Sequence, residues 1–322
     1  MNTRRITRLG WDVTDIGYGM WGMGGWTGSD DAASSASLDR AVALGCNFFD
    51  TAWAYGEGRS ERLLGDLVRR HAGARLFTAT KVPPKDRVWP GKGTKPVDQV
   101  FPYEHIVEYT DRSLADLGTD VVDLQQLHVW DDRWATDDGW KRAVEDLKRA
   151  GKIRAFGISV NRWEPENVLH ALETGLVDTV QVVHNIFDQA PEDALFDVCA
   201  KKGIGVIARV PFDEGSLTGT LTAATRWPDG DFRNIYFQAP KLQETLTRVA
   251  PLKALVDEWG ESLPSVALRF ILAHPAVTTV IPGMRALANV EANLAVSGRP
   301  LPAAQIAALR AFRWDRKPDH RP

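Results

Sequence analysis

Strand-like and helix-like segments alternate along most of this chain of 322 residues. Short apolar runs that suit buried strands are followed by segments with helical periodicity, and this order is typical of βα units that build a parallel sheet. We count eight such units, and the predicted strands end near Gly17, Asp50, Lys81, Leu127, Ser159, Val183, Ala208 and Pro282. The length is normal for one barrel of roughly 250 residues with insertions, so residues 1–322 are expected to form a single domain.

Segments outside the repeating units add to this picture. Residues 4–17 alternate like a small hairpin that could close the bottom of a barrel. Three longer connections, at 83–103, 129–138 and 210–239, follow the third, fourth and seventh strands. They are rich in Pro, Gly, Asp and Trp, and we expect them to extend over the carboxyl face and shape a pocket. Glycines suit the C-cap positions of three predicted helices: Gly45, Gly151 and Gly203.

Composition favours a cytoplasmic enzyme. The formal charge of −3 provides no basic field for nucleic acid and no polybasic segment for a membrane. The first ten residues lack an apolar signal core, and no stretch approaches the roughly 20 apolar residues that span a bilayer. Cys46 and Cys199 read as reduced core thiols, and the histidines form no triad, so no metal site is expected. These patterns do not define an oligomeric state.

Polar residues stand at or just after three of the predicted strand ends. Asp50 ends one apolar run with Tyr55 shortly after it, Lys81 ends the next run, and His128 follows the run after that. Because the carboxyl ends of parallel strands share one edge, we expect these side chains to meet there. They are candidates for one cluster.

The residue types in this cluster suit proton transfer to or from an oxygen. A tyrosine has an ordinary pKa near 10, which a nearby cation such as Lys81 would lower. Asp50 would keep that lysine charged, and His128 could hydrogen-bond a substrate oxygen. No side chain supplies a hydride, so a nicotinamide or flavin cofactor is implied. Taken one at a time, these residues could instead be a salt bridge, a packed ring and a core histidine.

Three segments, FFDTAWAYGEGRSERLLGDLV, TATK and LQQLH, resemble the aldo-keto reductase family. The likeness continues through residues 151–159, 180–188, 208–219 and 280–294, so it covers nearly the whole chain. It implies a (β/α)8 TIM barrel that reduces carbonyl compounds with NAD(P)H. The order and spacing of the family's catalytic positions match four residues here: Asp50, Tyr55, Lys81 and His128.

The loop after the first predicted strand carries a glycine motif. Residues 17–22 match G-x-G-x-x-G, but a loop follows where a dinucleotide-binding turn requires a helix, so we interpret the match as chance. The resemblance instead places Met20 and Trp21 under the nicotinamide and against the substrate. The alternative is a turn followed by a packed tryptophan.

The resemblance also assigns the nicotinamide end of a cofactor site. Ser159 and Gln181 fall where the family binds the carboxamide. Val160 replaces the usual asparagine, and Asn161 follows it. Arg209 stands where the family usually has an aromatic residue that stacks on the nicotinamide, and its planar guanidinium can stack in the same way.

Two further segments resemble the phosphate and adenosine ends of that site. The loop from Pro211 to Gly219 is similar to the family's pyrophosphate segment, with Leu217 and Thr218 as further candidates. Arg285 is the cation placed to meet a 2′-phosphate, which favours NADP (as NADPH) over NAD. The adenosine end as a whole aligns with Gly283, Met284, Arg285, Asn289 and Asn293.

Tryptophans follow or interrupt the segments that carry the cluster. Trp21, Trp53 and Trp130 are expected to wall the substrate pocket, since aromatic walls suit an apolar or ring-bearing carbonyl compound. Ordinary core packing is the alternative. The chain ends in RWDRKPDHRP, which suggests a frayed basic tail rather than a lid over the pocket.

Together these features predict an NADP-dependent oxidoreductase that reduces small-molecule aldehydes or ketones to alcohols, with hydride from nicotinamide and Tyr55 as the proton donor. One alternative is an NAD-dependent sugar or alcohol dehydrogenase on the same barrel. Another is a slowly turning, nucleotide-sensing regulatory subunit.

Overall fold

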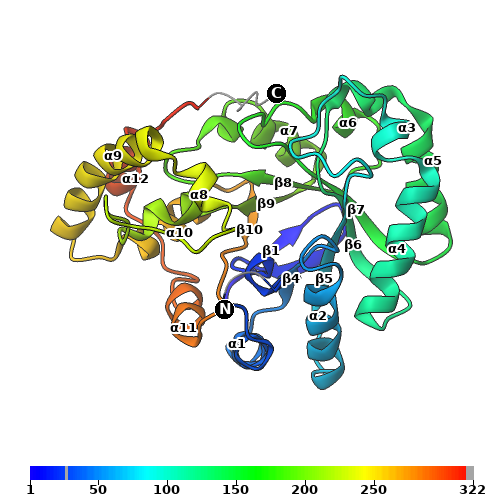
Figure 1. Ribbon diagram of the computed structural model, residues 1–322, viewed down its shortest axis with the longest axis horizontal. Coiled ribbons are helices and arrows are strands. Elements are labelled where there is room, and N and C mark those ends of the chain that lie inside the picture. Colours follow the sequence, from blue (N-terminus) through cyan, green and yellow to red (C-terminus); the bar gives the residue numbers. More distant parts are fainter. Residues whose placement is uncertain (26–27, 317–322) are drawn as a thin grey trace.

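The computed structural model describes residues 1–25 and 28–316, and its centre is an eight-stranded parallel sheet (Figure 1). Neighbouring strands pair in chain order from β3 to β10, and bridges from Ile16 to Val280 and from Gly19 to Gly283 close the sheet on itself. The strands are β3 (Tyr18–Gly19), β4 (Phe48–Asp50), β5 (Phe77–Val82), β6 (Val122–Leu127), β7 (Ile153–Ser159), β8 (Thr179–Val183), β9 (Gly205–Arg209) and β10 (Val277–Val280). The expected (β/α)8 barrel is confirmed. The predicted ends of β4, β6, β7 and β8 coincide with the observed ones, and the other four differ by one or two residues.

The barrel strands are nearly continuous apolar runs because they are buried on both faces. All six residues of β5 are buried, because parallel strands are covered by helices on one face and by the barrel interior on the other. Alternation along β5 sends its two polar side chains in opposite directions. Thr80 points outward and donates to Glu61 at 2.5 Å, whereas Lys81 points inward to Asp50. This alternation delivers Lys81 to the inside of the barrel.

Helices surround the strands (Figure 1). Asp30 caps α1 by accepting from the backbone N–H of Ala33 at 2.7 Å, and the predicted C-cap glycines Gly45, Gly151 and Gly203 all have positive φ. The α-helices are α1 (Asp31–Ala43), α2 (Arg59–Arg70), α3 (Val97–Val100), α4 (Tyr103–Leu117), α5 (Asp138–Arg149), α6 (Leu169–Glu173), α7 (Leu195–Lys202), α8 (Arg233–Tyr236), α9 (Ala239–Glu258), α10 (Leu263–Ala273), α11 (Leu287–Leu294) and α12 (Ala303–Arg310). None of the helices in the described part of the chain is both long and apolar enough to cross a membrane.

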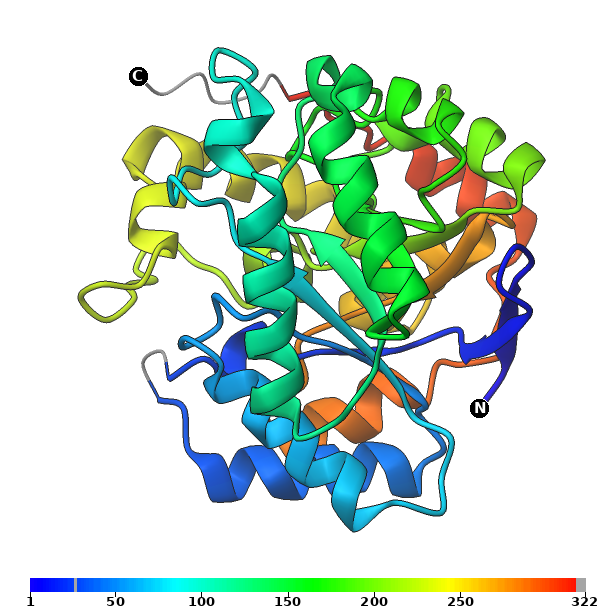
Figure 2. The ribbon, with the colours of Figure 1, turned by 90° about the vertical axis from the view of Figure 1, so that its right-hand side faces the viewer.

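The N-terminal hairpin closes one end of the barrel. It consists of β1 (Thr3–Ile6) and β2 (Trp11–Thr14), which pair antiparallel. Ile6 and Val13 pack into one buried cluster with Phe48 and Phe77 from the barrel strands. This confirms the predicted hairpin and its place at the bottom of the barrel. Figure 2 shows the hairpin at one end of the molecule and the long connections at the other.

The long connections carry short helices of their own at the carboxyl ends of β5, β6 and β9. Segment 83–103 contains α3, segment 129–138 contains the 3-10 helix η2 (Asp132–Thr136), and segment 210–239 contains η4 (Asp213–Thr218) and α8. Two further 3-10 helices are η1 (Trp21–Met23) and η3 (Ala190–Glu192). The mouth of the barrel is therefore framed by the segments that the sequence indicated.

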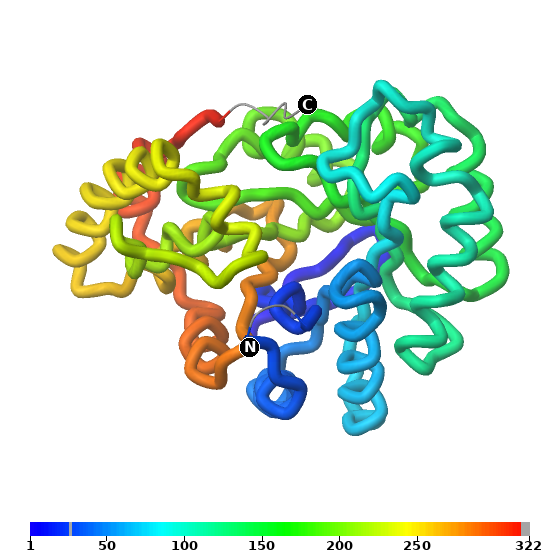
Figure 3. Tube along the Cα trace, in the orientation of Figure 1, coloured from blue at the N-terminus to red at the C-terminus, as the bar shows by residue number. Residues whose placement is uncertain are grey.

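The C-terminal segment after α12 packs against the rest of the protein and is not frayed as predicted (Figure 3). After α12 it docks on the chain that follows β8, where the Trp314 backbone N–H donates to the Phe187 carbonyl at 2.9 Å. Arg316 is almost fully buried, with 5% of its side chain exposed. The prediction of a frayed tail is wrong up to residue 316, because Trp314 and Arg316 bond to residues outside the C-terminal segment. Residues 317–322 lie outside the described part.

Candidate active site

The four polar residues expected to form a cluster lie together at the carboxyl edge of the barrel. Asp50 ends β4, Lys81 lies next to the end of β5, and His128 follows β6. Lys81 Nζ is 2.5 Å from Asp50 Oδ1 and donates to the Thr51 carbonyl at 2.7 Å. The Tyr55 ring centroid is 5.2 Å from Lys81 Nζ and 5.6 Å from the centroid of the His128 ring.

Asp50 is buried, and both of its carboxylate oxygens are occupied. Oδ1 faces Lys81, while Oδ2 accepts hydrogen bonds from Gln126 Nε2 at 3.1 Å and Gln181 Nε2 at 2.8 Å. A buried lysine stays charged only beside an anion, and a buried carboxylate needs donors for its remaining lone pairs. The two glutamines therefore support the ionised pair. Gln126 was not among the expected site residues, although an amide inside the buried run 121–128 was a usable signal.

Tyr55 keeps its proton in the nucleotide-free protein. Burial raises the pKa of its phenol, and the positive charge of Lys81 opposes that rise. The direction of the lysine's effect is the one expected from the sequence, but the net shift is upward because the loss of hydration is the larger cause. A protonated phenol is the form that can donate.

His128 is neutral at ordinary pH. Burial lowers its pKa well below the usual value, and the charges of Lys81 and Arg209 act in the same direction. Its Nδ1 is buried and has no hydrogen-bond partner within residues 1–25 and 28–316. The ring of Trp89, from segment 83–103, meets the imidazole edge-on with the centroids 5.9 Å apart. A neutral imidazole with a spare nitrogen can bind a ligand oxygen through that nitrogen.

Arg209 ends β9 and adds a half-buried cation to this edge. Its Nη2 donates to the Val160 carbonyl at 2.9 Å, while Nε lacks a partner in the described chain. Burial lowers the pKa of Arg209 to about 10, and the neighbouring charge of Arg162 contributes. A planar guanidinium with an unused donor can pack against a ring or bind an acceptor.

The expected carboxamide-binding residues lie side by side. Ser159 ends β7 and is paired in register with Gln181 of β8. The amide nitrogen of Gln181 is engaged by Asp50, so this residue also supports the cluster. The Asn161 side chain is bonded to another segment of the protein. Its side chain exchanges two hydrogen bonds with the Gly91 backbone, at 2.9 and 3.0 Å, and so ties segment 83–103 to the end of β7.

The loop after β3 confirms that the G-x-G-x-x-G match is not a dinucleotide-binding turn. It continues into the short η1 rather than an α-helix. A Cβ on Gly19 would lie 2.6 Å from the Ile281 carbonyl oxygen, so close approach of the neighbouring strand explains this glycine. Met20 is fully buried, whereas Trp21 is 42% exposed and meets Phe232 of segment 210–239 edge-on at 5.4 Å.

The expected phosphate and adenosine residues lie on η4 and around the start of α11. Leu217 and Met284 are buried, Pro211 lies just before η4, and Thr218 and Gly219 end it. Arg285 reaches back to the loop after β3, where Nη1 is 3.4 Å from the Gly22 carbonyl oxygen. Within α11, Asn289 is exposed and Asn293 is buried, and Gly283 precedes the helix on the exposed side.

The three tryptophans expected to wall the pocket lie in different surroundings. Trp130 is completely buried and packs edge-on against Trp134 and Trp140. Trp53 is buried against Tyr109. For these two the structure shows the core-packing alternative, and Trp21 alone of the three is substantially exposed. Sequence reasoning missed Trp89, which is 44% exposed, although its position in the first long connection was a signal.

Within residues 1–25 and 28–316 there is no group of three or more His, Cys, Asp or Glu side chains that could hold an ion. His184 is buried against Phe196, and its Nε2 lies 3.0 Å from Glu192 Oε1.

Fold and site define an enzyme of the (β/α)8-barrel class, and comparison with known proteins gives its family. The model of the aldo/keto reductase family matches residues 15–313. Aldo-keto reductase YhdN of Bacillus subtilis (strain 168) is 29% identical over 92% of this chain and 89% of its own length. The NADH-specific methylglyoxal reductase of Escherichia coli (strain K12) is 27% identical over 92% and 95%. The structure of a glycerol dehydrogenase from Gluconobacter oxydans superimposes with a TM-score of 0.80 at 26% identity, covering 99% of this chain and 98% of that one.

This chain therefore belongs to the aldo/keto reductase family. It is an oxidoreductase of the kind that reduces carbonyl compounds, and its family uses nicotinamide cofactors.

The residues at the carboxyl edge fit a nicotinamide dinucleotide. His128 Nδ1 and Arg209 Nε are buried without partners in the described chain, which is the state expected of groups that meet a ligand. A Cβ added to Gly215 or Gly283 would meet nothing within 4 Å, so there is open space beside η4 and before α11. Both glycines follow barrel strands, β9 and β10, and so lie on the carboxyl face that carries the polar cluster.

Proposed function

We propose that this protein is an NADP-dependent reductase of aldehydes or ketones in which Tyr55 donates the proton. The observation that carries the proposal is the cluster itself. The protonated Tyr55 ring lies close to both Lys81 and the neutral His128, so a carbonyl oxygen bound beside Tyr55 and His128 meets a hydrogen-bond donor from each. NADPH would supply the hydride when bound.

The residues divide the remaining tasks. His128 orients the carbonyl oxygen and, because its pKa is lowered well below the usual value, is a poor acceptor for the proton. Lys81 lowers the cost of forming the phenolate after Tyr55 gives up its proton, because it remains positively charged beside Asp50. Arg209 packs against the nicotinamide, while Ser159 and Gln181 bind its amide. The loop from Pro211 to Gly219 holds the diphosphate.

Arg285 supports NADP over NAD. Its guanidinium lies between α11 and the loop after β3, on the side where Gly283 is open. A guanidinium pairs with phosphate through parallel hydrogen bonds, so a 2′-phosphate would bind there better than a hydroxyl. An NAD-linked dehydrogenase is the second candidate. It is favoured by the NADH-specific relative and by the structural likeness to a glycerol dehydrogenase.

Nucleotide titration tests the proposal. NADPH and NADH are added to the protein while quenching of tryptophan fluorescence is followed, with wild type, Arg285→Met and Arg40→Met compared. Arg40 is the control because it pairs with Glu291 of α11 at 2.9 Å and is 43% exposed. We expect wild type to prefer NADPH and Arg285→Met to lose about tenfold or more for NADPH alone. Equal affinities would favour the NAD-linked candidate, and failure to bind either nucleotide would contradict both.

A further inference from the structure

A buried ion cluster joins three segments that are far apart in the sequence. Arg316, from the C-terminal segment, donates through Nη1 to Asp213 Oδ1 at 2.8 Å and to the Tyr236 hydroxyl at 2.9 Å. Its Nη2 pairs with Asp188, which follows β8. The exposed fractions of the three charged side chains are 5% for Arg316, 7% for Asp188 and 1% for Asp213. One guanidinium therefore bridges two buried carboxylates.

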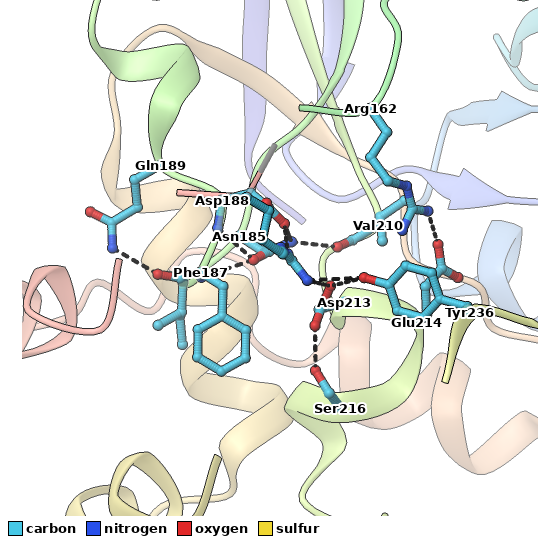
Figure 4. Close-up of polar contacts among 12 residues, drawn as sticks. Arg162, Asn185, Phe187, Asp188, Gln189, Val210, Asp213, Glu214, Ser216 and Tyr236 are labelled. Atoms are coloured by element: carbon cyan, nitrogen blue, oxygen red, sulfur yellow. Dashed lines mark hydrogen bonds and ion pairs between the residues drawn. The ribbon is translucent and has the colours of Figure 1, made fainter. Parts of the chain in front are cut away.

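Asp213 lies at the tip of the loop Val210–Gly219, and its side chain holds that tip in shape. Figure 4 shows it accepting from Ser216 Oγ at 2.7 Å and from the Tyr236 hydroxyl at 3.0 Å. Asp213 and Glu214 have φ of 44° and 57°, a left-handed conformation that residues with a side chain rarely adopt. Such a backbone persists only where the surroundings fix it, and here the contacts of the carboxylate do so.

The second acid of the loop tip is paired in the same manner. Glu214 forms an ion pair with Arg162, which comes from the segment after β7 (Figure 4). Both carboxylates of the tip are thus neutralised by arginines from outside the loop. An unpaired carboxylate here would repel a diphosphate that approaches the same loop.

Arg316 is the only ion-pair partner of Asp188 and Asp213 within residues 1–25 and 28–316. Removing it would leave two carboxylates buried together with no direct ion-pair partner, which is strongly unfavourable. The C-terminal segment holds the guanidinium in a fixed position because the segment packs against the rest of the protein. Arg316 lies over the rings of Trp163 and Trp314, at 4.9 and 4.8 Å from their centroids.

We propose that Arg316 is a positioning residue that latches the loop Val210–Gly219 in its binding conformation, so that the C-terminal segment sets how fast the dinucleotide leaves. The inference rests on the proposed function, because that function assigns residues Pro211 to Gly219 of this loop to the diphosphate. Arg316 acts through Asp213 in two ways. It fixes the left-handed tip, and it cancels a negative charge next to the bound diphosphate.

The test compares Arg316→Met with Arg313→Met in the full-length protein. Arg313 lies three residues earlier and also makes ion pairs, with Asp193 at 2.5 Å and Asp315 at 2.6 Å, but its side chain is 33% exposed. Hydrogen exchange is measured first without nucleotide. We expect the amides of residues 210–219 to exchange at least tenfold faster in Arg316→Met, and to be unchanged in Arg313→Met. Protection of β4–β8 in the same experiment reports that the barrel has folded.

Nucleotide release is measured second, by displacement of NADPH in stopped flow. Arg316→Met should release it at least tenfold faster than wild type, and Arg316→Lys should lie between them, since an ammonium keeps the charge but cannot bridge both carboxylates. Unchanged loop exchange in Arg316→Met would overturn the latch. Faster exchange with an unchanged release rate would overturn its link to the nucleotide. If wild type binds neither nucleotide, the proposed function fails, and the exchange data still decide whether Arg316 holds the loop.

Discussion

Gln181 donates a hydrogen bond to Asp50 across 131 residues of sequence, from Nε2 to Oδ2 at 2.8 Å. Gln126 donates to the same oxygen at 3.1 Å, so the carboxylate that holds Lys81 is itself held by two amides, one from β6 and one from β8. The position of Lys81 therefore depends on a buried hydrogen-bond network rather than on a single ion pair.

Replacing these amides should destabilise the protein in a coupled way. Each of Gln181→Leu and Gln126→Leu removes one bond to a charged acceptor, which is worth about 1.5–3 kcal/mol. The double variant should lose more than the sum, because Asp50 Oδ2 then has no donor from either amide. Urea unfolding of the four proteins measures the coupling. Additive losses would show that the two bonds act independently.

Tyr55→Phe should abolish most turnover without weakening nucleotide binding. The phenol oxygen is the proton donor in the proposed reaction, and loss of a positioned acid slows a reaction by about 10²- to 10⁴-fold. Tyr103→Phe is the matched control, since its hydroxyl donates to Asp146 at 3.0 Å on the outer face of the barrel. Steady-state kinetics and nucleotide titration of both variants decide the point. A fully active Tyr55→Phe enzyme would refute the assignment.

The pH profile of carbonyl reduction should show no ionisation of His128 near 6.5, because burial and two nearby cations lower its pKa well below that value. The same shift affects stability. Between the folded pKa and 6.5 the unfolded chain binds the proton and the folded chain does not, so this group's contribution falls as pH drops. Denaturant unfolding at pH 7 and pH 5 should show His128→Asn losing less stability on acidification than wild type. Equal losses would contradict a depressed pKa.

Glu61 should make the protein less stable as pH rises. Burial raises the pKa of its carboxyl to about 7 from an unfolded value near 4.5, so the folded state keeps a proton that the unfolded state releases. Its contribution is complete below 4.5 and declines by about 3 kcal/mol as pH passes 7. Glu61→Gln should remove this decline. Glu108→Gln, 55% exposed on α4, is the control and should leave the pH dependence unchanged.

The barrel could be predicted from sequence because its rules are local. A strand such as β5 is recognisable as an apolar run, and a polar residue at the C-terminal end of that run must lie at the carboxyl edge of the barrel. Asp50, Lys81 and His128 follow from these two facts alone. Trp130 shows where the same reasoning fails. It directly follows the cluster in sequence, yet its ring turns into the core against Trp134 and Trp140.

Contacts between distant segments could not be predicted. The ion pair of Arg316 with Asp213 joins residues 103 positions apart, and no periodicity connects a C-terminal arginine with a loop tip. The bonds from Asn161 to Gly91 are of the same kind. Such pairs depend on how long loops fold over the mouth, which local propensity does not specify.

Arg209→Met should stabilise the nucleotide-free protein while weakening nucleotide binding. The guanidinium is half-buried with one hydrogen bond, to Val160, and its buried Nε lacks a partner in the described chain, so removing it relieves a poorly compensated charge. We expect a gain of about 1–2 kcal/mol in the free energy of unfolding, as is common when a residue is kept for function rather than stability. NADPH affinity should fall by about tenfold or more, equivalent to about 1.4 kcal/mol per factor of ten.

Arg209→Lys separates the effect of charge from that of shape, since it keeps a cation but loses the planar guanidinium that packs against a ring. Thermal unfolding of the three proteins with and without NADPH provides both readouts. A Met variant that is less stable than wild type without nucleotide would show that Arg209 serves the fold rather than the ligand.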